Sequence, residues 1–222
     1  MRSALDLSVY LVTDTALCGD VGVVATVRAA VANGVSLVQL RDPEADDDTF
    51  VALGRELVDE LRGTGVPLIV NDRVHLTEAI GAAGAHVGQG DLDAVPARRL
   101  LGPEAVLGLS VQTLDHVEAA RELGSVIDYL GVGPVWAQDT KPDAAAPGGL
   151  DLLRDIVIAS PWPCVAIGGI GGERVAAVRR TGAAGVAVVS AICGRPDIAS
   201  ATAQVRRTWD QPADDETGAR SR

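Results

Sequence analysis

Eight short apolar runs recur along the chain, separated by stretches with helical periodicity. Between the runs, apolar residues return every three or four positions, as at Phe50, Leu53 and Leu57, which is the spacing of one helix face. Strands that are apolar on both sides and alternate with helices form parallel βαβ units. Eight such units predict an α/β protein with a (β/α)8 TIM-barrel architecture. The runs begin at Val9, Ser36, Pro67, Ala85, Val106, Tyr129, Cys164 and Gly185.

The chain of 222 residues has a length that one barrel can use without a second domain. We therefore expect a single catalytic domain over residues 1–209. The segment 210–222, which starts at Asp210, has no large apolar side chain. Because such a segment cannot bury enough apolar surface to order itself, we expect a disordered C-terminal tail.

Charge and cysteine content exclude several classes of function. The chain has 19 basic and 30 acidic residues and a net charge of −11, which argues against nucleic-acid and anionic-membrane partners. Its three cysteines are widely spaced, so we expect buried thiols rather than disulfides or a zinc site. Asp6 and Asp14 interrupt any signal-peptide core, and no run approaches the ~18 apolar residues of a membrane span. We expect a cytoplasmic protein. The sequence does not determine the oligomeric state, and a homo-oligomer is one possibility.

Polar residues follow the predicted strands at the rim where such barrels carry their active sites. Two carboxylates, an arginine, a lysine and a glycine pair on one rim suit a metal-bound, multiply charged phosphate ligand. Lys141 is the single lysine, beside 18 arginines. In strand order, the rim residues are Gln39, Arg41, Asn71, Asp72, Asp91, Ser110, Thr140, Lys141, Gly168, Gly169, Val189 and Ser190.

Several of these residues also have a purely structural interpretation. Asp72 and Asp91 could cap the helices that follow them, and the glycine pair Gly168–Gly169 could form only a tight turn. His86 lies in an apolar run and is expected to be a hydrogen-bonded core histidine. In the functional interpretation, the backbone amides after the seventh and eighth strands form the phosphate site common in this barrel.

Nine segments in order resemble the thiamine phosphate synthase family, from Val9 to about Arg207. That family couples a hydroxymethylpyrimidine diphosphate to a thiazole phosphate and releases pyrophosphate. The resemblance implies a dissociative transferase reaction in which small phosphorylated molecules are the partners and Mg²⁺ is the cofactor. The segments are YLVTD, VQLR, LIVNDR, HVGQGDL, GLSVQT, DYLGVGPV, DTKPD, AIGGI and GVAVVSAI.

The resemblance also implies roles for individual residues. Asp72 and Asp91 match the Mg²⁺ ligands, and Arg41, Lys141 and Ser110 match groups that act on the diphosphate or its pyrimidine. Residues of the pyrimidine diphosphate site are matched by Gln39, Arg41, Asn71, Ser110 and Lys141. Residues of the thiazole phosphate pocket are matched by Thr140, Gly168, Gly169, Val189 and Ser190.

Two positions depart from the family pattern. Pro43 stands where the family has a second diphosphate-binding lysine, and Gln138 stands where it has a threonine. These departures leave two alternatives open. One is a thiazole tautomerase, which needs the phosphate pocket but neither the diphosphate clamp nor the metal pair. The other is a non-catalytic barrel that binds a thiamine precursor and regulates a partner.

Overall fold

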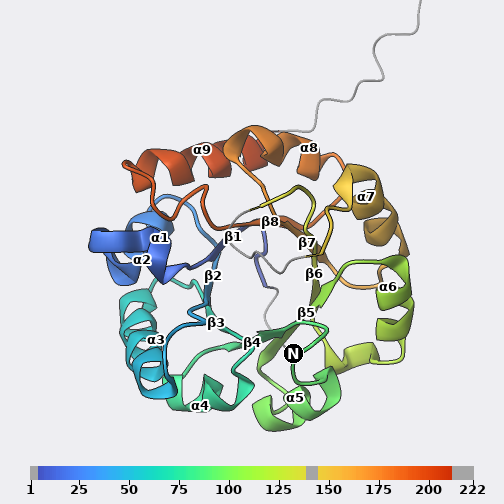
Figure 1. The fold of residues 1–222 in the computed structure, drawn as a ribbon, viewed down its shortest axis with the longest axis horizontal. Helices are drawn as coiled ribbons and strands as arrows, with labels where there is room; N and C mark the ends of the chain where they lie inside the picture. The colour runs from blue at the N-terminus through green and yellow to red at the C-terminus, as the bar shows by residue number, and fades with distance from the viewer. Residues whose placement is uncertain (1–4, 139–144, 212–222) are drawn as a thin grey trace, which may run out of the picture.

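A computed structural model of the protein describes residues 5–138 and 145–211. Its eight parallel strands close into a barrel in the order of the sequence, and helices surround the barrel (Figure 1). The predicted (β/α)8 architecture is therefore confirmed, and every strand coincides with one of the apolar runs. The strands are β1 (Val9–Val12), β2 (Leu37–Leu40), β3 (Leu68–Asn71), β4 (Gly84–Val87), β5 (Val106–Val111), β6 (Tyr129–Val132), β7 (Cys164–Ile167) and β8 (Gly185–Val188).

The outer layer consists of helices of very unequal length. The longest, α3, begins where the Asp46 carboxylate accepts a hydrogen bond from the Thr49 amide, which satisfies one of the free N–H groups of the first turn. The last, α9, ends at Asp210, so this residue belongs to a helix, whereas residues 212–222 lie outside the described part. The helices are α1 (Thr15–Cys18), α2 (Val23–Val31), α3 (Asp47–Leu61), α4 (Thr77–Ile80), α5 (Ala94–Leu101), α6 (Leu114–Arg121), α7 (Gly149–Ala159), α8 (Val175–Arg179) and α9 (Ile198–Asp210).

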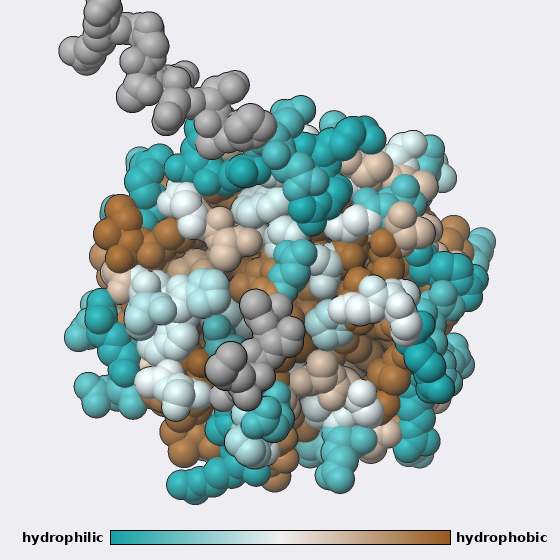
Figure 2. All heavy atoms as spheres, turned by 180° about the vertical axis from the view of Figure 1, so that it is seen from behind, coloured by the Kyte–Doolittle hydropathy of each residue, from teal (hydrophilic) through white to brown (hydrophobic). Residues whose placement is uncertain are grey.

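The alternation of side chains along each strand creates two separate apolar cores. The larger core lies between the strands and the helices. The smaller one lies inside the barrel, where side chains from the strands pack against one another. Seen from behind, hydrophilic residues cover much of the edge of the molecule, and hydrophobic patches show both near its middle and at parts of its edge (Figure 2). The buried residues of the inner core are Leu7, Tyr10, Val12, Leu37, Ile69, Tyr129, Val165 and Ala187.

Glycines on the inner wall make room for the few large side chains there. A Cβ atom at Gly108 would lie 2.3 Å from both His86 Nδ1 and Tyr129 Cζ, and one at Gly131 would lie 2.8 Å from His86 Cε1. Both distances are shorter than any van der Waals contact. The inner wall therefore has glycine at β5 and β6 because an imidazole and a phenol occupy that space.

The remaining general expectations concern cysteines and membranes. Cys18, Cys164 and Cys193 are buried and free, as expected. No helix in the described ranges is long and apolar enough to cross a bilayer.

Candidate active site

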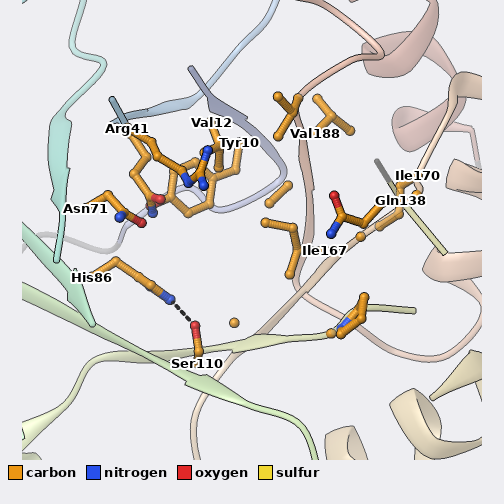
Figure 3. A pocket seen from close by; sticks show the side chains of 18 of the residues that line it. Tyr10, Val12, Arg41, Asn71, His86, Ser110, Gln138, Ile167, Ile170 and Val188 are labelled. Carbon is orange, nitrogen blue, oxygen red and sulfur yellow. Dashed lines mark hydrogen bonds between the residues drawn. The ribbon is translucent and has the colours of Figure 1, made fainter. Parts of the chain in front are cut away.

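A cavity lies at the carboxyl ends of the strands, the end where barrels of this kind carry their active sites (Figure 3). Most of the predicted rim residues line it, whereas Thr140 and Lys141 lie outside the described residues. The predicted residues that line the cavity are Gln39, Arg41, Asn71, Ser110, Gly168, Gly169, Val189 and Ser190. Other lining residues are Tyr10, Val12, His86, Gln112, Gly131, Gly133, Pro134, Gln138, Ile167, Ile170, Ala187 and Val188.

The two sides of the cavity differ in chemistry. The labelled side chains of Arg41, Asn71 and Ser110 place polar atoms on one side, whereas Ile167 and Val188 form an apolar wall opposite them (Figure 3). A ligand with a charged part and an apolar ring would match both sides.

Arg41 follows β2 and shares the inward face with Gln39, as the two-residue period predicts. Its amide donates to Thr13 Oγ1 at 3.0 Å, and its Nη1 lies 4.0 Å from an Asp14 carboxylate oxygen. This long ion pair leaves guanidinium N–H groups available to an anion in the cavity. The guanidinium is therefore placed to bind phosphate oxygens.

Asp72 and Asp91 lie at the ends of the adjacent strands β3 and β4 but are not among the residues that line the cavity. The Asp72 carboxylate accepts from Asn71 Nδ2 at 2.6 Å, and its backbone has a φ of 57°, a strained value that is found at functional sites. Asp91 Oδ2 accepts from the Gly88 amide at 2.8 Å. The expectation that Asp91 caps the following helix is wrong: Asp93 is the N-cap residue of α5, and the Asp91 carboxylate instead closes the turn from Gly88.

The donor set at this edge fits one kind of metal better than others. No group of three or more His, Cys, Asp or Glu side chains gathers anywhere in the described ranges. Mg²⁺ commonly uses only one or two protein carboxylates and completes its octahedron with water and substrate phosphates. A pair of carboxylates near the mouth of the cavity is compatible with that pattern, and their role as metal ligands stays a prediction.

The opposite side of the cavity includes a backbone loop that only glycine can form. Gly168 and Gly169 have φ values of 98° and 65°, and a Cβ at either residue would come within 2.5 Å of Pro134 or Ala137 atoms. The Trp136 amide donates to Gly168 O at 3.0 Å. The tight-turn interpretation is therefore correct, and the same turn lines the cavity beside Ser190 of the neighbouring β8 end.

Arg174 supports this glycine turn from outside. Its guanidinium donates to Gly169 O and lies over the Trp136 ring, 4.9 Å from its centroid. Both contacts hold the turn against the segment after β6.

The two positions that depart from the family pattern behave differently. Gln138 lines the cavity, and its amide points into it (Figure 3). Pro43 is not a lining residue; it lies in the loop after β2, which Arg73 holds by donating to Ala45 O at 2.5 Å. The polar group at position 138 is thus exchanged for another polar group, whereas Pro43 brings no charge.

Sequence reasoning missed a buried polar chain that crosses the floor of the cavity. Gln39 Nε2 donates to the Tyr10 hydroxyl at 2.6 Å, and the Tyr10 and Tyr129 hydroxyls are 2.9 Å apart. His86 joins Tyr129 through Nδ1 at 2.9 Å and Ser110 through Nε2 at 2.8 Å. His86 is hydrogen-bonded in the core, as expected, but it also lines the cavity. The available signal was that both tyrosines of the chain fall in predicted strands.

The structure is a closed (β/α)8 barrel. Arg41 and side-chain amides lie on one side of its mouth, and a glycine turn lies on the other. These features define a class: barrel enzymes suited to phosphorylated small molecules. Comparison with known proteins identifies the family within this class. The profile of the thiamine monophosphate synthase family matches residues 9–192. The chain belongs to this family.

Individual relatives agree over almost their whole length. The chain is 47% identical over 201 residues to the thiamine-phosphate synthase of Azorhizobium caulinodans, which covers 90% of this chain and 94% of that one. It is 47% identical to the thiamine-phosphate synthase of a Psychrobacter species, covering 88% and 92% of the two chains. The solved thiamine phosphate pyrophosphorylase of Pyrococcus furiosus superposes with a TM-score of 0.83 at 33% identity, covering 92% and 96%.

Proposed function

We propose that this chain is a thiamine-phosphate synthase, a transferase that joins 4-amino-2-methyl-5-(diphosphooxymethyl)pyrimidine to a thiazole phosphate. The products are thiamine phosphate and pyrophosphate. The observation that carries the proposal is the identity of 47% over 90% of the chain with a curated synthase. Support also comes from the gathering of eight expected substrate-binding residues around one cavity. Neither the tautomerase nor the regulatory barrel gains support from these relatives.

The reaction breaks the bond between the pyrimidine methylene carbon and the diphosphate oxygen, and the electron pair leaves with pyrophosphate. The electron-rich aminopyrimidine stabilises the carbocation that remains, and the thiazole nitrogen then forms the new C–N bond with its lone pair. No protein nucleophile is required. The protein has to stabilise negative charge on the departing diphosphate, which preorganised donors do efficiently.

Arg41 and Lys141 are the cationic groups that we assign to the diphosphate. Arg41 reaches the cavity with N–H groups left by its weak ion pair to Asp14, and a guanidinium fork binds two phosphate oxygens at once. Gln39, Asn71 and Ser110 would orient the pyrimidine ring. The absence of a lysine at position 43 leaves these two cations with a larger share of the charge.

Asp72 and Asp91 would hold Mg²⁺ at the edge of the cavity. When bound, Mg²⁺ neutralises charge on the diphosphate oxygens. The chain contributes the geometry: Asn71 orients the Asp72 carboxylate at 2.6 Å, and the Gly88 amide orients the Asp91 carboxylate at 2.8 Å.

We assign the thiazole phosphate to the glycine turn and the end of β8. Gly168, Gly169, Val189 and Ser190 line this part of the cavity, and Thr140 is expected to complete it. Backbone amides bind phosphate without any protein charge. We further propose that the enzyme acts in the cytoplasm, and a homo-oligomer is compatible with the proposed reaction.

The decisive experiment measures pyrophosphate release and thiamine phosphate formation by the purified chain. With both substrates and Mg²⁺, we expect equal amounts of the two products. Omission of Mg²⁺ or of the thiazole phosphate should stop thiamine phosphate formation. Product formation without the pyrimidine diphosphate, or none with the complete mixture, would contradict the proposal.

A further inference from the structure

Only one arrangement of protons gives both buried tyrosine hydroxyls of the hydrogen-bond chain from Gln39 to Ser110 an acceptor. Among the described residues, the Tyr10 hydroxyl meets Gln39 Nε2 at 2.6 Å and the Tyr129 hydroxyl at 2.9 Å. The amide nitrogen can only donate, so the Tyr10 oxygen accepts from Gln39. The Tyr10 proton then goes to the Tyr129 oxygen, because a buried hydroxyl proton left without an acceptor is costly.

The same reasoning continues from Tyr129 to the cavity. The Tyr129 oxygen accepts from Tyr10, so its own proton goes to His86 Nδ1, 2.9 Å away. An imidazolium would place two protons in that bond, so the imidazole is neutral and carries its proton on Nε2. Nε2 then donates to Ser110 Oγ at 2.8 Å, and the Ser110 proton is left for a ligand in the cavity.

Burial supports this assignment because it keeps the two phenols protonated. Tyr10 is 2% and Tyr129 0% exposed, and removal from water raises the pKa of both hydroxyls. Gly108 and Gly131 hold the space in which Tyr129 and His86 meet. Each hydroxyl therefore carries one proton, and all hydrogen bonds of the chain are donated in one direction, from Gln39 toward Ser110.

We infer that this hydrogen-bond chain couples Gln39 to Ser110, the two residues at its ends. Gln39 presents its side-chain oxygen to the cavity as an acceptor whenever Ser110 presents its proton as a donor. Tyr129 and His86 are positioning residues: they act through Ser110. An amide reversal at Gln39 would reverse every bond and turn Ser110 toward His86.

This polarity selects a ligand that donates near Gln39 and accepts near Ser110. An aminopyrimidine does both, because its exocyclic amine donates and its ring nitrogens accept. A 4-oxo analogue exchanges the donor and acceptor along that edge and would be refused. The identity of the ligand rests on the proposed function, whereas the polarity of the chain does not.

The test uses 15N NMR of the histidine side chains in the full chain without substrate. The protein has three histidines, and the variants His75→Gln and His116→Gln assign the signals. In the wild type we expect His86 to be protonated at Nε2 and bare at Nδ1. A proton on Nδ1 in the wild type would overturn the inference without any variant, and without bearing on synthase activity.

The variant Gln39→Glu provides the remote test. The variant is measured at a pH at which the 13C shift of the new carboxyl group shows it to be ionised. An ionised carboxylate can only accept, so Tyr10 must donate to it, and every later bond must reverse. We expect His86 Nδ1 to gain a proton in Gln39→Glu but not in the control Asn71→Asp, which makes the same amide-to-acid change outside the chain. In Gln39→Glu/Tyr129→Phe the link is broken, and Nδ1 should stay bare. A bare Nδ1 in the single variant Gln39→Glu would overturn the inference.

Discussion

Single carboxylates at the mouth combine a structural contact with an expected role in metal binding. Asp91 accepts from the Gly88 amide, and Asp72 accepts from Asn71. An asparagine can make the same acceptor contacts with its amide oxygen but offers a much poorer Mg²⁺ ligand. At these two positions the two roles can therefore be separated by removing charge while keeping shape.

We predict that Asp72→Asn and Asp91→Asn each lower the rate of thiamine phosphate formation by at least about 10²-fold at saturating substrate, as expected when a transition-state charge loses its partner. Steady-state kinetics over a range of Mg²⁺ concentrations measures this. The melting temperature should remain close to that of the wild type. Wild-type rates in either variant would show that the carboxylate is not a metal ligand.

The hydrogen-bond chain makes a second prediction at the scale of residues. Tyr129→Phe should lower kcat/KM for the pyrimidine diphosphate by about three- to tenfold, the effect of one hydrogen bond. In a Ser110→Ala background the same change should have almost no effect, because Tyr129 acts through Ser110. Kinetics of the two single variants and the double variant form the cycle. Additive losses would mean that Tyr129 affects the site by another route.

At the scale of elements, the strands could be predicted well and their ends less well. Apart from Gly84 at the start of β4, each strand lies in a predicted apolar run, because apolar content on both faces is a local property that sequence displays directly. The predicted runs from Val9 and Cys164 extend two residues beyond the observed strands. Of these extra residues, Gly168 and Gly169 have positive φ values and form the turn at the rim, whereas the Thr13 amide still donates to Gln39 O of β2 at 2.9 Å.

Inward-facing glycines on the strands limit how the inner core can pack, because a larger residue there would collide with neighbouring side chains. We predict that Gly108→Ala destabilises the protein by about 1–3 kcal/mol, the usual effect of overpacking a core, since the new Cβ would meet His86 and Tyr129 at 2.3 Å. Gly90→Ala is the matched control, because no atom lies within 4 Å of its added Cβ. Urea denaturation measures both. Equal stabilities would show that the wall can relax around a methyl group.

At the scale of the whole molecule, the sequence predicted the polar residues at the rim of the cavity but not the buried hydrogen-bond chain beneath it. Polar residues at strand ends, such as Arg41 and Asn71, are conspicuous because they follow apolar runs. Tyr10, Tyr129 and His86 were inconspicuous because each fits an apolar strand, and only the closure of the barrel brings β1, β4 and β6 around one interior. Contacts across a barrel depend on its register and radius, which a linear pattern does not display.

Because the cavity is lined from opposite sides of the barrel, its ligands should stabilise the entire fold. We predict that Mg²⁺ and pyrophosphate together, at about 100 times their Kd, add about 2.7 kcal/mol to the free energy of unfolding. For a chain of this size that raises the melting temperature by about 5–10 °C. Differential scanning calorimetry measures the shift. Asp72→Asn should remove the part that depends on Mg²⁺, and an equal shift in that variant would contradict the assigned site.

The one-way chain of hydrogen bonds under the cavity also bears on how this enzyme can change. Side chains from five of the eight strands share a single proton order, so a substitution at Gln39 alters what Ser110 offers on the far side of the barrel. Substitutions toward a new ring substrate should therefore be epistatic. Each lowers activity when made alone and is neutral or favourable when the other positions of the hydrogen-bond chain are changed with it. Directed evolution that randomises positions 39, 86, 110 and 129 together should reach oxo-pyrimidine substrates that libraries built one position at a time do not.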